Sequence, residues 1–161
     1  MTELAVIEAE PTQGGFLNLF GGASPVEVVH QTAQIADALA DVLRKKKLFA
    51  NIQGKNYVTV DGWQLLGSML GVFPVCVWTK ELGDGQGWEA RVEARTRDGA
   101  VVGAAEAECR RSERSWANRD SYALRSMAQT RATSKALRQP LGFVVKLAGY
   151  ESTPSEEIPS A

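Results

Sequence analysis

Two neighbouring segments of the chain alternate residue by residue and have almost no side-chain bulk on one face. They are GWEARVEARTR (87–97) and AVVGAAEAECR (100–110), joined by an Asp-Gly pair that is a strong hairpin signal. In the register that this turn predicts, the small-residue face pairs Ala90 with Ala107, Val92 with Ala105, and Ala94 with Gly103. The charged face pairs Glu89 with Glu108, Arg91 with Glu106, and Arg95 with Val102. A face this bare buries little area alone, but it lets another element approach closely.

The run SYALRSMAQTRATSKALRQPLG (121–142) supplies a matching element. Placed on a helix at 100° per residue, its Ala128, Ala132 and Ala136 form one row, which we expect to lie on the bare sheet face. Pro140 and Gly142 predict the end of this helix. The following FVVKLAGY is then expected to be a final extended or packed segment.

The rest of the chain predicts four shorter elements. Ser24, Pro25 and Glu27 form a helix start, and apolar residues at helical spacing carry that helix to about Lys46. Runs at 48–52 and 56–60 predict a hairpin, a short helix follows with Asp61 as its cap, and a third strand covers 74–82. The expected fold is α+β, with an N-terminal helix, a β-hairpin, a short helix, a three-stranded antiparallel sheet and a long helix packed on it, which is a β-β-β-α core.

Length and punctuation predict one folded domain over residues 25–149. Residues 1–24 and the acidic tail 150–161 are expected to be flexible. The chain has no apolar run of membrane-spanning length, and its acidic N-terminus is unlike a signal peptide, so we expect a cytoplasmic protein with no membrane partner. Cys76 and Cys109 are interpreted as small core residues, and no metal or cofactor is expected.

Charge is distributed unevenly along the chain. Residues 1–43 and 149–161 contain nine acids and no Lys or Arg. All 18 Lys and Arg lie between positions 44 and 146 with the other 10 acids, so that this stretch carries +8 although the whole chain carries −1. A basic middle favours a polyanion partner, most often nucleic acid.

The long helix concentrates part of this charge. Arg131, Lys135 and Arg138 fall within about 60° of one another, next to the alanine row, while Arg125 points elsewhere. No acid lies between Asp120 and the helix end, so these cations lack helix-local partners and a bound phosphate backbone would relieve their repulsion. The alternative interpretation is a solvated helix face.

The string YALRSMAQTRATSKALRQPLGF resembles the corresponding stretch of the essential recombination function (Erf) family of phage single-strand annealing proteins, within the superfamily of ring-forming annealing recombinases. Residues 25–150 are also similar to that superfamily in element order. The resemblance implies a homo-oligomeric ring or filament that binds single-stranded DNA in a basic groove and anneals complementary strands in homologous recombination without ATP. It also implies that the protein works in the cytoplasm or nucleoid of a bacterial host and that it is not an enzyme.

The residues that we expect to bind DNA come from four regions. The long helix would line the groove with Arg131, Lys135 and Arg138, and Arg125 lies on the same helix. The first hairpin would offer Lys55 and Tyr57, the end of the first helix Lys45, Lys46 and Lys47, and the sheet-to-helix corner Arg110, Arg111, Arg114 and Trp116. Trp116 and Tyr57 are candidates for stacking on bases, although core packing explains Trp116 equally well. Trp63, Trp78 and Trp88 are interpreted as core residues.

Two other functions fit parts of the sequence. Four sheet carboxylates could bind the metal of a nuclease, although cross-strand ion pairs with Arg91 and Arg95 are the simpler interpretation. They are Glu89, Glu93, Glu106 and Glu108. The chain could instead be a phage or mobile-element assembly scaffold that binds no DNA. The acidic tail could contact a replication or recombination protein, or serve only as solubilising disorder.

Overall fold

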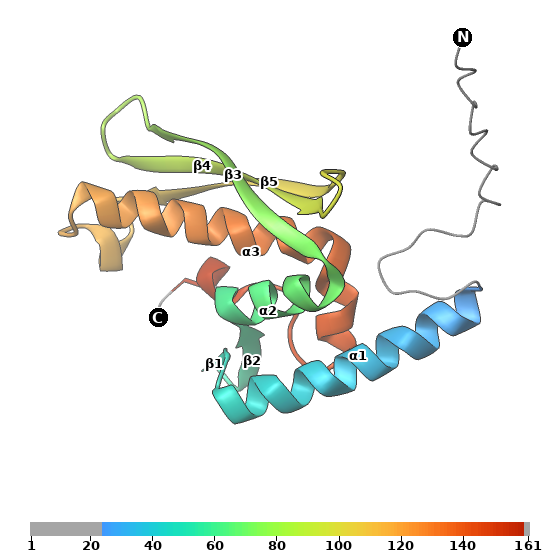
Figure 1. Cartoon of the computed structure of the whole chain (residues 1–161). Helices are drawn as coiled ribbons and strands as arrows, with labels where there is room; N and C mark the ends of the chain where they lie inside the picture. The colour runs from blue at the N-terminus through green and yellow to red at the C-terminus, as the bar shows by residue number, and fades with distance from the viewer. Residues whose placement is uncertain (1–23, 160–161) are drawn as a thin grey trace, which may run out of the picture.

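The computed structural model describes residues 24–159, and they form the predicted α+β arrangement (Figure 1). The predicted flexible segment 1–24 lies outside these residues except for Ser24. The elements in chain order are α1 (Pro25–Lys46), β1 (Phe49–Ile52), β2 (Lys55–Val58), α2 (Val60–Leu70), β3 (Val72–Glu81), β4 (Gly87–Thr96), β5 (Val101–Arg110), the 3₁₀ turn η1 (Arg114–Trp116), α3 (Ser121–Leu147) and the 3₁₀ turn η2 (Ser155–Glu157). In Figure 1 the sheet lies above α3, and α1 and α2 lie below it.

The three-stranded sheet has the order β3-β4-β5 with antiparallel pairing. Its predicted register holds from the Glu89–Glu108 pair to the Ala94–Gly103 pair. Arg95 was wrongly predicted to face Val102, since it pairs with Val101. The turn is one residue longer than expected, because Thr96 and Ala100 close a three-residue loop. The register shift between Ala94 and Arg95 absorbs that extra residue and restores the predicted pairing.

The seam between α3 and the sheet is built from small residues, as predicted. Ala128, Ala132 and Ala136 are fully buried, and they meet β4 and β5 on the face that carries Ala90, Val92 and Ala94, which is also buried. Gly103 sets the closeness of the approach, because a Cβ there would lie 2.6 Å from the carbonyl oxygen of Ala136. The predicted bare face is therefore the contact surface of the helix.

The prediction that Pro140 and Gly142 end α3 is wrong. The helix continues to Leu147, with Pro140 inside it. A proline inside a helix costs about 3 kcal/mol, whereas each buried Leu or Val contributes about 1.5 to 3 kcal/mol. The turns beyond the proline bury three such residues, so tertiary packing outweighs the local penalty. They are Leu141, Val144 and Val145.

The two shorter helices, α1 and α2, both contact α3. The hydroxyl of Ser24 caps α1 as predicted, accepting the Glu27 N–H at 3.3 Å. Gln53 and Gly54 form the tight turn between β1 and β2, both with positive φ. The prediction that Asp61 caps α2 is wrong, because the helix begins at Val60 and Asp61 lies in its first turn.

The cap of α2 comes from the far end of the chain. The side chain of Thr59 at the N-cap position makes no capping bond, and the Val60 N–H donates instead to Glu156 Oε1 at 2.7 Å. Glu156 belongs to the C-terminal segment, residues 151–159. The Glu151 N–H donates to the Asn56 carbonyl at 2.9 Å, and Pro154 is buried. The expected flexible tail 150–161 is thus, over residues 150–159, a segment placed against the body of the protein.

The tryptophans and cysteines divide between core and surface. Trp63 is fully buried, Trp88 packs against the core, and Trp78 is half-buried. Cys109 is buried as predicted, and burial raises the pKa of its thiol to about 11. Cys76 is exposed, which corrects the prediction of a core role, because its strand β3 is an edge of the sheet. No helix within residues 24–159 is long and apolar enough to span a membrane.

Candidate nucleic-acid interface

Arg131 is the first residue of the predicted cationic row, which consists of Arg131, Lys135 and Arg138, but its charge is already matched. Its guanidinium donates to both carboxylate oxygens of Glu113, at 2.9 and 2.6 Å. It also donates to the carbonyl of Glu108 at 2.8 Å and to that of Glu156 at 3.1 Å. The hydrogen bonds from Arg131 lower the pKa of Glu113 and raise that of Arg131. With only 18% of its side chain exposed, Arg131 joins three segments of the fold.

The other two members of the row differ in their surroundings. Arg138 lies 3.7 Å from Glu157 Oε2. Lys135 is exposed and has no ion pair among the residues described. The prediction of an uncompensated row is therefore wrong for Arg131 and Arg138. Their partners come from outside the helix, so the helix-local pattern of charge could not reveal them.

Lys135 opens onto a groove of about 610 Å³. The groove lies between η1, one face of α3 and the C-terminal segment, and its walls combine aromatic, apolar and charged side chains. The side chains that line it include Arg114, Trp116, Met127, Arg131, Lys135 and Ile158. Trp116 is half-buried and packs against the hydrophobic core, while Arg114 and Lys135 are exposed.

The four carboxylates of the groove are engaged by other parts of the fold. Glu108 pairs with Arg110 at 2.7 Å, and Glu113 pairs with Arg131. Glu157 pairs with Arg138, and Glu156 caps α2. In contrast, neither Arg114 nor Lys135 has a carboxylate partner between residues 24 and 159. The groove thus presents two available cations beside an indole ring.

The loop that leads into α3 adds further arginines next to this groove. Arg111 donates to the carbonyls of Ala117 and Arg119, at 3.5 and 2.7 Å, so its guanidinium holds the loop together. Arg119 is exposed, and Tyr122 at the start of α3 is 71% exposed. Neither Arg119 nor Tyr122 was predicted as a site residue. Their place in the short Arg-rich corner between strand and helix was the only available signal.

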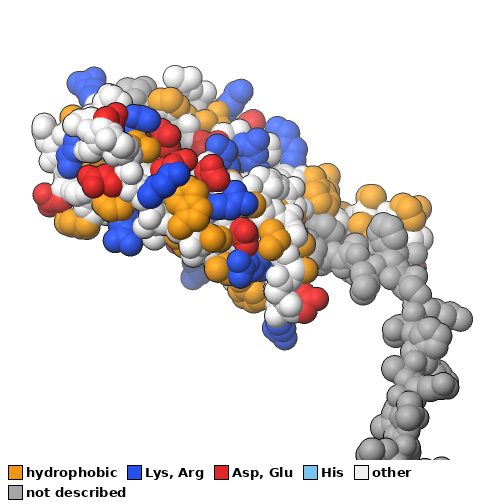
Figure 2. Space-filling model, turned by 90° about the horizontal axis from the view of Figure 1, so that it is seen from above, with side chains coloured by type: hydrophobic (Ala, Val, Ile, Leu, Met, Phe, Trp, Pro, Cys, Tyr) orange, Lys and Arg blue, Asp and Glu red, His pale blue; other side chains and the backbone are white. Residues whose placement is uncertain are grey.

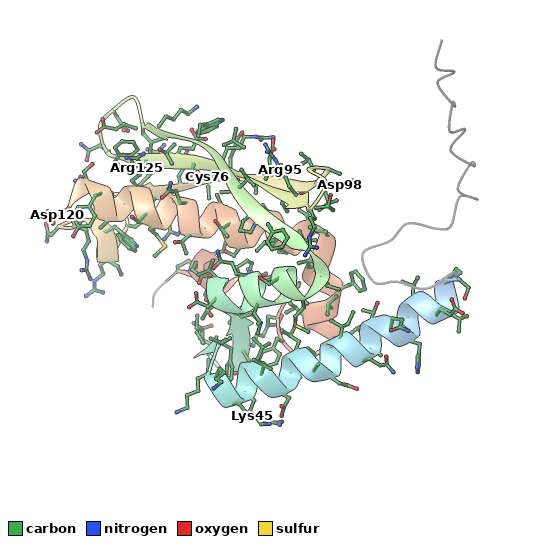
Figure 3. All side chains as sticks on the ribbon, viewed as in Figure 1. Lys45, Cys76, Arg95, Asp98, Asp120 and Arg125 are labelled. Carbon is green, nitrogen blue, oxygen red and sulfur yellow. The ribbon has the colours of Figure 1, made fainter. Side chains whose placement is uncertain are left out.

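Arg110 and Arg125 do not line the groove themselves. Arg110 pairs with Glu108 and with Asp84, the latter at 3.4 Å, and its pKa is raised by the Glu108 hydrogen bond. Arg125 stacks over Trp88 at 5.3 Å and donates to Thr79 Oγ1 at 3.0 Å. Figure 3 shows Arg125 on the side of α3 that faces the sheet.

The remaining predicted DNA-binding residues lie on other elements. Lys45 pairs with Asp41 at 2.8 Å at the end of α1, away from Arg125 in Figure 3. Lys46 and Lys47 are exposed there, and Lys55 is exposed beside the β1–β2 turn. Tyr57 is half-buried in β2, and its backbone forms an isolated parallel β-bridge with Glu151. None of these five side chains lines the groove.

The sheet carboxylates proposed as nuclease ligands are paired with cations. Glu106 pairs with Arg91 across the strands at 3.0 Å, and Glu93 pairs with Arg95 at 2.6 Å. Glu89 pairs across the strands with Lys80 at 3.2 Å. Figure 2, viewed from above the sheet, shows Lys and Arg interspersed with Asp and Glu. The part of the chain that the structure describes contains no cluster of three or more potential metal ligands.

A comparison with family models of known proteins found no match, and comparisons with curated proteins and with solved structures also found none.

Proposed function

We propose that the protein binds single-stranded DNA through the groove and anneals complementary strands without ATP, as a homo-oligomer. The observation that carries the proposal is the shared cavity of Trp116, Arg114 and Lys135. Phosphates need cations that are not already engaged, and unpaired bases need a flat π surface. The groove combines both within one hollow, next to the arginines of the α3 entry loop.

The chemistry of annealing asks for no catalytic group. Neutralising phosphates lowers the repulsion between two strands, while bases outside the groove stay available for pairing. Stacking on an aromatic ring contributes about 1 to 3 kcal/mol per base and does not depend strongly on sequence. Trp116 can serve one base per protomer, so a long strand would need several protomers side by side.

The binding test compares two charge-matched double variants on labelled oligonucleotides. Arg114→Ala/Lys135→Ala is expected to lower the salt dependence of binding, with a log–log slope smaller by about 1.4 for two lost phosphate contacts. Arg97→Ala/Lys146→Ala removes the same charge outside the groove and should keep the slope. Equal slopes for both variants would contradict the proposed site.

A second assay separates the three functions. Two complementary strands are mixed with the protein without ATP or divalent metal, and pairing is followed by fluorescence. Acceleration supports annealing. A cleavage product in a parallel reaction with Mg²⁺ would indicate a nuclease, and the absence of both pairing and cleavage would favour an assembly scaffold. Light scattering with and without DNA measures the oligomeric state, and a monomer under both conditions would contradict the homo-oligomer.

A further inference from the structure

We propose that the C-terminal segment is a tethered anionic ligand of α3, which competes with a DNA strand for Arg138 at the end of the cationic row. The inference rests on the proposed function and adds a mode of regulation to the same groove. The DNA-binding surface then extends beyond the groove to Arg138, and the C-terminal segment covers that part of the surface.

The segment contacts two cations of the row, the structural Arg131 and the more exposed Arg138. The carbonyl of Glu156 accepts from Arg131 Nε, and Glu157 Oε2 lies near Arg138 Nη1. Ser155 to Pro159 form one wall of the groove, next to Lys135. An acidic segment therefore occupies the position beside Arg138 that a phosphate of a bound strand would take.

The contacts of the segment are incomplete where it meets α3. Glu156 Oε2 and Glu157 Oε1 are buried, yet neither has a hydrogen-bond partner in the region 24–159. A buried acceptor without a donor is destabilising, and a half-exposed ion pair at 3.7 Å adds little. The start of the segment is held more firmly, by the Glu151 backbone bond and the burial of Pro154. This arrangement favours release at the Glu157 end while the segment remains attached.

The test uses the full chain and two variants that remove the same charge from the same segment. Glu157→Gln takes the carboxylate from Arg138, while Glu151→Gln takes one from Lys146, at 3.5 Å and outside the groove. Glu157→Gln is expected to tighten single-stranded DNA binding about three- to tenfold at low salt and to steepen the log–log slope by about 0.7, the value for one more phosphate contact. Glu151→Gln is expected to match the wild type.

Hydrogen exchange adds a measurement that does not depend on affinity. The Val60 amide is bonded by Glu156, and the amides of Glu157 and Ile158 are bonded within η2. If the segment leaves α3, saturating DNA will accelerate exchange at these amides. Unchanged exchange and equal affinities of Glu157→Gln and wild type would overturn this inference and leave the proposed function standing. Failure of every variant to bind DNA would overturn both.

Discussion

Replacing Arg131 by alanine should lower the free energy of unfolding. Such a loss of stability distinguishes a structural arginine from one that only contacts DNA. The change removes a two-oxygen ion pair with Glu113 and the donors of two main-chain carbonyls. Hydrogen bonds to charged groups contribute about 1.5 to 3 kcal/mol each, and a buried acceptor left alone costs about 1 to 3 kcal/mol. These values do not add fully, because 37% of the Glu113 side chain is exposed and water replaces part of the loss.

The expected loss is about 2 to 4 kcal/mol in the free energy of unfolding, or about 5 to 15 °C in Tm for a chain of this size. Urea and thermal unfolding followed by circular dichroism measure both quantities. Lys135→Ala is the matched control one turn along the helix, and its effect should stay within about 0.5 kcal/mol.

A double-mutant cycle with Glu113→Gln isolates the pair itself, and we expect a coupling energy of about 1 to 3 kcal/mol. Unfolding of Arg131→Ala at the wild-type midpoint, with no coupling to Glu113, would refute the structural role. A drop in DNA binding by this variant carries no weight until its folding has been checked.

Three further predictions concern the seam, the ion pair and the thiols. Gly103→Ala should destabilise the fold by about 1 to 3 kcal/mol through overpacking, while Gly83→Ala, where a Cβ meets nothing within 4 Å, should have little effect in the same urea titration. Because the folded pKa of Glu113 lies below its ordinary 4.5, its contribution is full above pH 4.5 and is lost as pH falls through the folded pKa. Glu113→Gln should therefore flatten the acid side of a stability-versus-pH curve, and an unchanged slope would argue against it. A thiol reagent at pH 8 should label Cys76 and spare Cys109 until denaturant is added, and fast labelling of both would contradict the burial.

The sheet and its register were predictable because local rules determine them. Strict alternation and one Asp-Gly turn predicted five cross-strand pairs, from Glu89–Glu108 to Ala94–Gly103. The error at Arg95 came from the length of the turn, which a bulge then corrected.

The end of α3 was missed for the opposite reason. A proline is a strong local signal, and only the packing of residues far from it in the chain shows why the helix continues.

The candidate site was less predictable than the fold. Charge along α3 was judged from partners three or four positions away, whereas Glu113 lies 18 positions before Arg131, and Glu157 reaches Arg138 from beyond the helix end. The sequence did identify Arg114, Lys135 and Trp116 as candidates. It could not show that these three share one cavity, because that depends on how η1 and the C-terminal segment fold against α3.

The alanine seam between α3 and the sheet also has a thermodynamic consequence. Alanine and glycine have no side-chain rotamers to freeze, so bringing these faces together costs almost no side-chain entropy. Attraction across the seam comes from many close atomic contacts, each of which weakens steeply with a gap of 0.5 to 1 Å. The helix and the sheet should therefore separate cooperatively rather than loosen gradually, and a displacement of one of them should move the other.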